Sequence, residues 1–523
     1  MVIPAFLVDS AERFGGNPAL VMDGRVLTYA ELEIASNRMA RSLIRYGVKR
    51  GDRVALWLPK SIEAIVSVWG IMKAGAAYVT VDPLAPPLRL ATIARDCEIA
   101  GLVTTSDRAE SLNPAFGGDA PMGAVWYADS AIDGPQIANR PPIRWDELDT
   151  ENESLPSVAI DGEDLASVQY TSGSSGTPKG VMVSHRALVG QAEWSCKKFA
   201  LSSADRLPGY TPLAGAMSSF EIFAGARAGA TTYPVPARLA PFPAPVARSW
   251  SEQRLTAWFV VPSVLTMMLN GANLGSLDLS PLRIVGFSGE KFPVERLREL
   301  MRLLPWVRFV NCYSRTESKL RTWHEIKFPP QESDTRRIGE TPPDWQFLVL
   351  DDDERPVPDE TVGELWISGP GVMNGYWNLR EMTAEVLKVV EVDGKRILAC
   401  RSGDLVKRHQ DGTLELVGRA GQQVKIRGHR VEIGEIEAVL SRHPAVMQAV
   451  VTVVLDDQIG NRLRAIIVLR DGARSDGHTL KRHCAEVLPP HMVPETFLFT
   501  SNLPLMSNGK IDRHTLLKQP DSG

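Results

Sequence analysis

Cysteine is scarce in this sequence, and paired cysteines are missing from it. The chain has five cysteines in 523 residues, and none of them belongs to a CxxC pair. Clustered or paired cysteines build structural zinc sites and the disulfide frameworks of secreted domains. We therefore expect neither a cysteine-based zinc site nor disulfides, and we expect a reducing compartment.

Excess charge of one sign and long apolar runs are missing as well. The 58 lysines and arginines nearly balance the 62 aspartates and glutamates, which leaves a formal net charge of −4. Without a basic field, neither nucleic acid nor an anionic membrane is an expected partner. The longest apolar stretch, 64–81, contains Lys73 and two glycines, so it suits a buried helix followed by a strand better than a membrane span.

The first residues carry no recognisable export signal. They read MVIPAFLVDSAERF, which lacks the basic segment of a signal peptide and reaches Asp9 early. Together with the scattered cysteines, this predicts a cytoplasmic protein.

Strand and helix patterns alternate repeatedly along the chain. Short apolar runs typical of buried strands are followed by segments whose apolar residues recur every three or four positions, as they do in helices. Such alternation is typical of parallel sheets covered by helices on both faces. We predict strands over 53–59, 77–81, 102–105, 283–287 and 308–313, and helices over 61–73, 88–99 and 294–304.

The length of the chain and a change in its composition predict two domains. A single hydrophobic core rarely serves 523 residues. Segment 110–156 is rich in Gly, Pro, Asp and Asn, and we interpret it as a surface excursion. After Gly418, a glycine- and charge-rich stretch precedes an amphipathic helix near 434–441. We predict an α/β fold with a large domain at 1–418, a hinge at 419–423 and a small, mobile α+β domain at 424–523.

A loop dense in hydroxyl groups follows a predicted strand at 166–170. Residues 170–180 read YTSGSSGTPKG, with three glycines, five Ser or Thr hydroxyls and Lys179. Glycines let several backbone N–H groups turn toward one point, and the hydroxyls and the lysine add donors and charge, so the loop suits a polyphosphate. A flexible surface loop is the alternative, and it explains this composition less well. The Walker A pattern GxxxxGK[ST] is absent.

Eight ordered motifs, this loop included, resemble the acyl- and aminoacyl-adenylate-forming superfamily, and freestanding peptide-synthetase-type adenylation domains most closely. The other seven are LTYAEL at Leu27, MKAGAAYVTVDP at Met72, NCYSRTE at Asn311, GELWISG at Gly363, RSGDL at Arg401, GRAGQQVKIRGHRVEIGEIE at Gly418 and SNGKIDR at Ser507. The resemblance implies stacked, mostly parallel sheets with a small β-barrel-like part in the large domain. It also implies ATP-dependent adenylation of a small acid with release of pyrophosphate.

The same resemblance implies which residues hold ATP and Mg²⁺. Asp404 resembles the acid that accepts the ribose hydroxyls, and Tyr313 the aromatic that stacks on adenine. Glu317 resembles the carboxylate that binds Mg²⁺, beside Thr316 at the α-phosphate. The implied nucleotide-binding residues are Thr171, Ser172, Gly173, Ser174, Ser175, Gly176, Lys179, Gly289, Glu290, Asn311, Tyr313, Asp404 and Arg419, and the implied catalytic residues are Lys510, Thr316 and Glu317.

Lys510, in SNGKIDR, resembles the lysine that the C-terminal domain inserts into the active site. A carboxylate and the α-phosphate must meet in this reaction, so catalysis consists mostly of positioning and charge neutralisation. The ammonium would bridge the two anions. A lysine near the end of a chain is ordinarily a solvated surface group, but the ordered series of motifs favours the catalytic interpretation.

The implied substrate pocket departs from that of domains specific for α-amino acids. Such domains usually carry an aspartate that pairs with the substrate ammonium, and alignment on Glu221 places Ala216 there. No aspartate lies between Arg206 and Asp278. Because a buried, unpaired ammonium is costly, an ordinary α-amino acid is not the expected substrate. The implied pocket residues are Ala216, Met217, Phe220, Val260, Gly286, Ser288, Cys312, Leu320 and Arg321.

Three further departures leave alternatives open. Arg321 either faces the pocket, where it would favour a second anionic group on the substrate, or points to solvent. Arg315, in NCYSRTE, either adds charge near the α-phosphate or faces outward. Gly421 stands where the family has Asp or Lys at the hinge, and glycine can absorb a large dihedral change.

The sequence as a whole predicts a freestanding adenylation enzyme of specialised metabolism that transfers its acyl group to a carrier-protein phosphopantetheine thiol. Alternatives within the superfamily are an aryl- or acyl-CoA ligase, an amide-forming ligase, and an enzyme that activates an oxyanion such as nitrite for transfer to an aryl amine. A non-catalytic binding module is the alternative outside it. The joint presence of Lys179, Glu317, Asp404 and Lys510 argues against such a module.

Overall fold

The computed structural model describes most of the chain, namely residues 1–129, 135–173, 177–215, 217–319, 322–392, 394–420, 423–454, 461–504 and 515–516. Some predicted site and hinge residues lie outside this range, and they are Ser174, Ser175, Gly176, Ala216, Leu320, Arg321, Gly421 and Lys510. Among the helices described, none has the length and apolar character needed to cross a membrane.

The first large sheet has seven strands in the order β7-β6-β5-β3-β4-β8-β9, all parallel except β9. The strands are β3 (Arg53–Trp57), β4 (Ala77–Thr80), β5 (Gly101–Thr104), β6 (Ala124–Tyr127), β7 (Pro142–Arg144), β8 (Leu165–Thr171) and β9 (Lys179–Ser184). The helices near it are α2 (Tyr29–Arg45), α3 (Ile62–Lys73), α4 (Pro87–Asp96), α5 (Ser106–Ala109), α6 (Leu112–Phe116) and α7 (His185–Phe199). The strand–helix alternation predicted over 53–105 is confirmed to within a few residues.

The segment 110–156 is more than the surface excursion that its composition indicates. Strands β6 and β7 and the 3₁₀ helix η1 (Trp145–Thr150) lie in it, and both strands extend the parallel sheet beyond β5. All four residues of β6 are buried. Strands of three and four residues are too short to show a period, so the surrounding glycines and prolines dominate the sequence pattern.

The second sheet has the order β12-β13-β14-β15, with β15 antiparallel to β14. Its strands are β12 (Ala257–Val260), β13 (Ile284–Ser288), β14 (Arg308–Cys312) and β15 (His324–Ile326), and its helices are α9 (Pro243–Glu252), α10 (Pro262–Gly271) and α11 (Val294–Leu303). The strands and helix predicted over 283–313 are confirmed here. Beside it lies the sheet β10-β11-β1-β2, made of β1 (Pro18–Met22), β2 (Arg25–Thr28), β10 (Arg206–Gly209) and β11 (Thr231–Pro234), near α1 (Pro4–Phe14), the π-helix η2 (Phe220–Ala224) and α8 (Gly225–Ala228).

An antiparallel sheet completes the large domain and corresponds to the predicted barrel-like part. Its strands pair in the order β16-β17-β19-β18, with β20 on β19. They are β16 (Gln346–Leu350), β17 (Val362–Ser368), β18 (Leu387–Val392), β19 (Lys395–Arg408) and β20 (Leu414–Arg419), and α12 (Arg380–Val386) precedes β18. The long strand β19 carries Asp404 into the interior.

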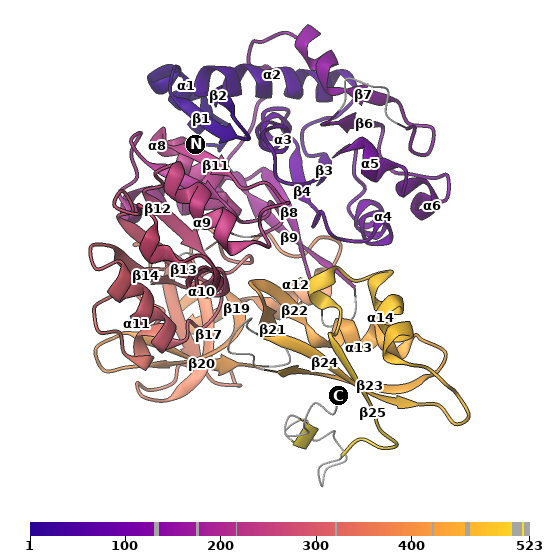
Figure 1. Cartoon of the computed structure of the whole chain (residues 1–523), viewed down its shortest axis with the longest axis vertical. Helices are drawn as coiled ribbons and strands as arrows, with labels where there is room; N and C mark the ends of the chain where they lie inside the picture. The colour runs from indigo at the N-terminus through magenta and orange to yellow at the C-terminus, as the bar shows by residue number, and fades with distance from the viewer. Residues whose placement is uncertain are drawn as a thin grey trace.

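From Gln423 on, the described residues form a small α+β unit, coloured orange to yellow in Figure 1. It begins with the hairpin of β21 (Gln423–Ile426) and β22 (His429–Glu432), followed by α13 (Ile433–Ser441), β23 (Val446–Val454), β24 (Arg462–Leu469), α14 (Gly477–Ala485), the 3₁₀ helix η5 (Pro490–Met492) and β25 (Thr496–Phe499). The predicted helix near 434–441 is α13. The boundaries 1–418, 419–423 and 424–523 stay predictions.

Candidate active site

The predicted phosphate loop lies against the C-terminal unit. The loop connects the antiparallel strands β8 and β9, in which Thr171 pairs with Lys179. Ser172 Oγ lies 3.0 Å from the carbonyl oxygen of Arg430, to which it donates, and it accepts from Glu432 N at 3.1 Å. Gly173 N donates to Glu435 Oε2 at 3.2 Å. Ser174, Ser175 and Gly176 lie outside the described residues.

Glu317 is the centre of the charged cluster. Its carboxylate is buried, accepts a short hydrogen bond from Arg430 Nη1, and lies 3.6 Å from Arg315 Nη2. Burial alone would raise its pKa, but Arg430, Arg315 and Lys179 together hold the pKa of Glu317 well below its usual range. Glu317 is therefore ionised at any physiological pH, although it is fully enclosed.

Asp404 forms a second buried anionic point on β19. Its Oδ2 accepts from Tyr313 Oη at 2.6 Å and from Arg315 Nη1 at 2.7 Å, and its Oδ1 lies 2.7 Å from Arg419 Nε. Burial would raise its pKa, but Arg315 and Arg419 hold the pKa of Asp404 below its ordinary value. The side chains predicted to meet adenine and ribose, Tyr313 and Asp404, are thus in direct contact.

Arg315 faces inward, which excludes the alternative in which it faces outward. Only 7% of the residue is exposed, and its guanidinium spans Asp404 and Glu317. The sequence change that places an arginine in NCYSRTE therefore adds a buried positive charge between the two carboxylates of the site. Thr316 is half-buried between Arg315 and Glu317.

The hairpin of β21 and β22 supplies two basic side chains that the sequence did not single out. Lys425 and Arg430 are cross-strand partners, so both point to the same face of the hairpin. Arg430 binds Glu317, and Lys425 is half-buried close to Gly289, where an added Cβ would lie 3.3 Å from its Nζ. Burial lowers the pKa of Lys425 to about 7, and Arg419 acts in the same direction.

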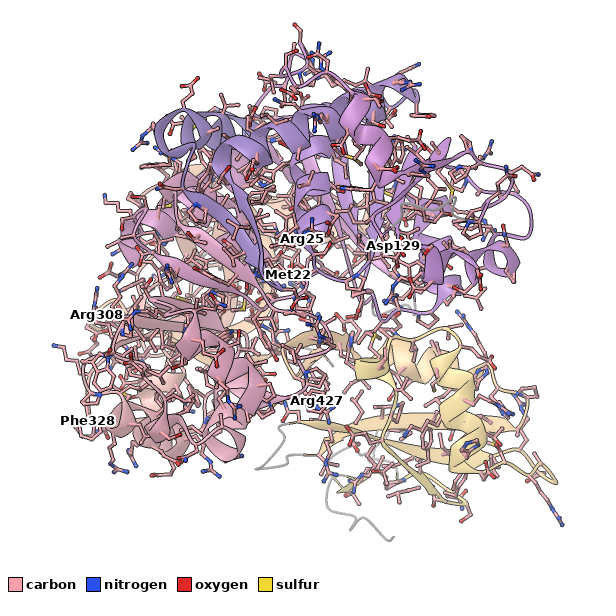
Figure 2. All side chains as sticks on the ribbon, turned by 45° about the horizontal axis from the view of Figure 1, so that its top comes forward. Met22, Arg25, Asp129, Arg308, Phe328 and Arg427 are labelled. Carbon is pink, nitrogen blue, oxygen red and sulfur yellow. The ribbon has the colours of Figure 1, made fainter. Side chains whose placement is uncertain are left out.

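A turn with two left-handed residues lets this hairpin approach the large domain. Arg427 and Gly428 have φ values of 48° and 83°, as a two-residue primed turn requires. A Cβ on Gly428 would lie 2.9 Å from Val261, so glycine permits the close approach. Arg427 is labelled in Figure 2, where the C-terminal unit meets the rest of the chain. The segment QVKI-RG-HRVE has the pattern of two short strands joined by a two-residue turn, and from that pattern the pairing of Lys425 with Arg430 could have been predicted.

Three more predicted nucleotide-site residues are held by polar contacts. Glu290 accepts from Ser263 N at 3.2 Å and from Gly428 N, so it links the start of α10 to the hairpin turn. Asn311 donates to the carbonyl oxygens of Asp334 and Arg337 at 3.3 and 3.2 Å, which makes its amide a connection between backbone segments. Lys179 Nζ lies 4.8 Å from the ring centroid of Tyr376, and burial followed by Arg430 lowers its pKa.

Most of the implied pocket residues that the structure describes lie in or against one cluster of buried hydrophobic side chains. Met217, Phe220 and Cys312 belong to it, and a Cβ on Gly286 would contact Phe199 and Phe259 there. Ser288 Oγ lies 3.1 Å from Ser314 Oγ at the end of β13. Ala216, Leu320 and Arg321 lie outside the described residues, so the two alternatives for Arg321 stay open.

Val260 packs apart from this cluster, whereas its neighbour Phe259 belongs to it. Val260 packs in the separate cluster that contains Trp258 and Val285, whereas Phe259 packs with Phe220 at 5.1 Å between ring centroids. Successive side chains of a strand point to opposite faces, so Phe259 and Val260 pack on different sides of β12. The assignment of Val260 to the substrate pocket stays a prediction.

The electrostatic balance of the site favours a polyanion. Around Glu317 and Asp404 stand the basic side chains of Lys179, Arg315, Arg419, Lys425 and Arg430. These five basic groups outnumber the two carboxylates even when Glu290, near Lys425, and Glu432, near Lys179, are included. A triphosphate would supply the missing negative charge and compensate the desolvation of these cations.

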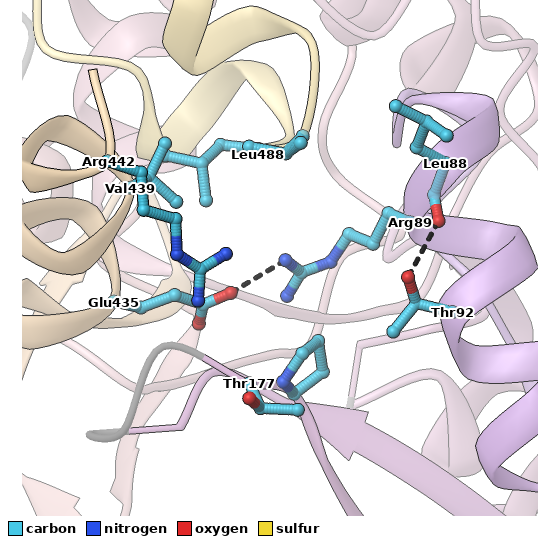
Figure 3. A pocket seen from close by; sticks show the side chains of 10 residues that line it. Leu88, Arg89, Thr92, Thr177, Glu435, Val439, Arg442 and Leu488 are labelled. Atoms are coloured by element: carbon cyan, nitrogen blue, oxygen red, sulfur yellow. Dashed lines mark hydrogen bonds and ion pairs between the residues drawn. The ribbon is translucent and has the colours of Figure 1, made fainter. Parts of the chain in front are cut away.

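A cleft of about 150 Å³ opens beside the phosphate loop, between α4 and the helices α13 and α14 (Figure 3). Thr177 and Pro178 line its floor, and Arg89 and Arg442 line its sides. Arg89 Nη1 binds Glu435 Oε1 at 2.7 Å across the cleft, and Glu435 is 1% exposed. Since Glu435 also binds Gly173 N, this ion pair ties the C-terminal unit to the loop.

Comparisons with known proteins identify the family of this chain. The AMP-binding enzyme family matches residues 7–377, and the AMP-binding enzyme C-terminal domain matches 435–510. The "L-proline--[L-prolyl-carrier protein] ligase" of Pseudomonas fluorescens is 31% identical, over 98% of each chain. The protein of the same name from Streptomyces coelicolor is 34% identical, over 97% of this chain and 94% of its own.

Solved structures show the same fold. The structure of the amide bond synthetase McbA from Marinactinospora thermotolerans matches 99% of both chains with a TM-score of 0.84 at 24% identity. At that identity the likeness concerns the fold, which is the α/β arrangement of a large domain with a small α+β domain. The family match covers most of the chain and the relatives extend over nearly all of it. This chain therefore belongs to the AMP-binding enzyme family and is an adenylate-forming acid–AMP ligase.

Proposed function

We propose that the enzyme adenylates a small carboxylic acid that lacks an α-ammonium group and then transfers the acyl group to a carrier-protein phosphopantetheine thiol. The observation that carries the first step is the cluster of basic side chains around Glu317 and Asp404, next to the phosphate loop. The carrier-protein acceptor is supported by relatives that are named as carrier-protein ligases.

In this proposal, ATP replaces ion pairs that the site now makes internally. The loop around Thr171 and Ser172 receives the β- and γ-phosphates, and Thr171 Oγ1 is buried without a hydrogen-bond partner among the described residues. Asp404 exchanges its bonds to Tyr313 and Arg315 for the ribose hydroxyls. Arg315 is then released toward the α-phosphate, where a guanidinium can neutralise the charge that develops.

Glu317 would hold Mg²⁺ in this proposal. Its Oε2 is buried and accepts no hydrogen bond from the described residues, and a carboxylate oxygen is the ligand that Mg²⁺ prefers. When bound, the ion neutralises phosphate oxygens as pyrophosphate leaves. Arg430 also binds Glu317, so the hairpin must withdraw before the carboxylate is fully available.

In this proposal Lys510, which lies outside the described residues, acts in a second arrangement of the domains. Leu503 and Leu516, which flank it in sequence, pack together with Val450 and Ile466, whereas α13 packs on Val451 and Ile467. Neighbouring residues of a strand face opposite sides, so Leu503 and Leu516 lie on the face of the sheet away from α13 and its contact with the phosphate loop. Rotation about 419–423 would exchange the hairpin for the segment that contains Lys510.

The substrate proposal rests on a missing counter-charge. Glu221 is the buried acid near the implied pocket, but it forms a short ion pair with Lys60 and accepts from Thr211 N at 2.9 Å. It is therefore committed to other partners and cannot pair with a substrate ammonium without leaving Lys60 unpaired. Two relatives are named for L-proline, which makes proline the competing candidate.

A pyrophosphate-release screen tests the substrate. The panel contains aryl acids, β-amino acids, dicarboxylates, L-proline, other α-amino acids, and nitrite with aryl amines. We expect an acid without an α-ammonium to give a kcat/KM at least about 10-fold above that of L-proline, since one unpaired buried charge costs several kcal/mol. L-Proline as the best substrate would contradict the counter-charge argument. Nitrite as the best substrate would show that the enzyme activates a non-carboxylate oxyanion and transfers no acyl group.

With the best substrate, three acceptors are then compared. The acceptors are phosphopantetheinylated carrier protein, CoA and free amines. Transfer of the acyl group to any of them releases AMP, but the products differ: a protein-bound thioester, an acyl-CoA and an amide, respectively. We expect the protein thioester to form fastest. Faster formation of acyl-CoA or amide would assign the chain to the corresponding alternative class.

Arg89→Ala is expected to slow thioester formation by about 10-fold while leaving pyrophosphate release within about twofold. Arg89 binds Glu435 and so stabilises the domain arrangement in which the hairpin lies at Glu317. Adenylation uses the other arrangement in our proposal, so it does not depend on this ion pair. Single-turnover transfer to the carrier protein measures the first effect. Arg95→Ala is the matched control, because Arg95 lies on the same helix and binds Phe116 O within the large domain. Equal losses in both half-reactions would contradict the assignment of this arrangement to transfer.

A further inference from the structure

A group of three side chains at the domain interface has no role in the proposed reaction. Asp82 follows β4 in the large domain, His429 begins β22, and His491 lies in η5. One ligand atom from each lies within 4.8 Å of the other two. Among the residues that the structure describes, no other set of His, Cys, Asp and Glu side chains converges in this way.

The two imidazoles lie face to face above the carboxylate. Their ring centroids are 3.8 Å apart with an interplanar angle of 14°, and His491 Nδ1 lies 3.5 Å from Asp82 Oδ2. The other carboxylate oxygen, Oδ1, accepts from Leu84 N at 2.8 Å. The backbone therefore fixes Asp82 with Oδ2 directed toward His491, as hydrogen bonds behind a metal ligand commonly do.

We propose that Asp82, His429 and His491 bind one divalent transition-metal ion of the Zn²⁺ type and so join the two domains. Two imidazole nitrogens and one carboxylate oxygen form the ligand set that suits Zn²⁺, Co²⁺ or Ni²⁺, whereas Mg²⁺ and Ca²⁺ prefer oxygen ligands throughout. Ligand atoms around a tetrahedral zinc ion lie about 3.4 Å apart, given zinc–nitrogen bonds of about 2.1 Å. Rotation of the imidazoles from their stacked position closes the remaining gap.

The charge state and the exposure of the group fit this role. Burial lowers the pKa of both histidines. At His429 the nearby Asp82 and Glu290 partly oppose that lowering of the pKa. At His491 the neighbouring His429 and Arg89 lower the pKa further. Both rings are therefore neutral near pH 7, with lone pairs available to an ion. The side chains of His491 and Asp82 remain 16% and 19% exposed, which leaves an entry path and a position for a water ligand.

Such an ion would favour the arrangement of domains seen here. Two ligands belong to the C-terminal unit and one to the large domain, so the complete site exists only while the hairpin lies against Glu317. A ligand that binds one arrangement alone shifts the equilibrium toward it by mass action. In terms of the proposed function, the ion would slow adenylate formation, which needs Lys510, and would leave thioester transfer intact. This kinetic consequence, unlike the site itself, rests on the proposed function.

Metal binding is tested on tag-free, nucleotide-free protein, because affinity tags and ATP bind the same ions. Titration calorimetry with Zn²⁺ and the visible absorption of Co²⁺ are expected to show one ion per chain and an upward shift in melting temperature. Asp82→Asn, His429→Gln and His491→Gln should each weaken binding by about 10- to 100-fold. The melting temperature of each metal-free variant shows whether it is folded, and a variant that is not folded is set aside in favour of the other two.

His443→Gln is the matched control. His443 and His483 also form a histidine pair, with centroids 5.2 Å apart and no place in the three-residue group, so this variant should bind metal as the unchanged protein does. The proposal is overturned if no ion binds, or if one ion binds with unchanged affinity after His429 and His491 are both replaced by glutamine. Because the measurement needs neither ATP nor acid, its failure is distinct from failure of the proposed function.

Discussion

Replacing Lys510 with alanine is expected to lower the rate of adenylate formation by about 100- to 1,000-fold, while the affinity for ATP changes by less than about threefold. The expected loss is large because the ammonium stabilises charge only when the carboxylate approaches the α-phosphate. In the substrate-free enzyme, Glu317 is already surrounded by Arg315, Arg430 and Lys179, so ATP binding has other cations to rely on. An interaction made only in the transition state lowers kcat and kcat/KM together.

The measurement for Lys510→Ala separates the two half-reactions. Pyrophosphate release reports adenylation, and equilibrium binding of a non-hydrolysable ATP analogue reports affinity. Adenylate supplied from outside should still be converted to thioester, because Lys510 has no role in that step in our proposal. Lys518→Ala removes another lysine of the same terminal segment and should leave pyrophosphate release unchanged. Pyrophosphate release near the unmodified rate in Lys510→Ala would refute the proposed role of the lysine.

Replacing Glu317 with glutamine is expected to reduce adenylation by about 100- to 1,000-fold as well, and in addition to destabilise the protein. The amide keeps the shape of the side chain but removes a magnesium ligand and the negative charge between Arg315 and Arg430. Breaking a buried ion pair by removing one partner typically costs about 3–5 kcal/mol. Since the pKa of Glu317 is held low, its charge contributes stability that is fully present above the ordinary glutamate pKa and is lost as the pH falls toward the folded-state value.

Two readouts distinguish catalysis from stability in Glu317→Gln. Thermal unfolding at neutral pH should show a lower melting temperature, and raising the Mg²⁺ concentration should restore only part of the activity. Glu325→Gln is the control, because Glu325 forms a partly exposed ion pair with Arg308 on the adjacent strands β14 and β15. This control should change stability little, as surface ion pairs contribute about 0–1 kcal/mol. Full activity of Glu317→Gln at low Mg²⁺ would contradict the assignment of the carboxylate.

The buried Arg315 pairs with both carboxylates of the site in the absence of substrate. With its guanidinium between Asp404 and Glu317, the enzyme satisfies both buried carboxylates before ATP arrives. In our proposal a nucleotide displaces these contacts, which costs binding energy. Until then Arg315 keeps both carboxylates paired in the interior, together with Arg419 at Asp404 and Arg430 at Glu317. The same residue is then in place beside the expected α-phosphate.

Ordered motifs carried the family and the fold class, and the resemblance implied the nucleotide-site residues. The hydroxyl-rich loop could be named from its own composition, whereas Glu317 and Asp404 were named through the motifs that contain them. The alternation of strands and helices over 53–105 and 283–313 was likewise local, since the period of apolar residues reports which face is buried.

Tertiary structure decided what depends on contacts between distant residues and on the face that a side chain takes. Arg315 faces inward because two carboxylates lie there, and β6 joins the sheet although four residues show no period. Phe259 and Val260 pack in separate clusters because strand neighbours point to opposite sides. The pairing of Arg430 with Glu317 and the group of Asp82, His429 and His491 exist only because the hairpin docks on the large domain. Local patterns cannot encode such contacts, since the free energy that forms them comes from packing between segments hundreds of residues apart.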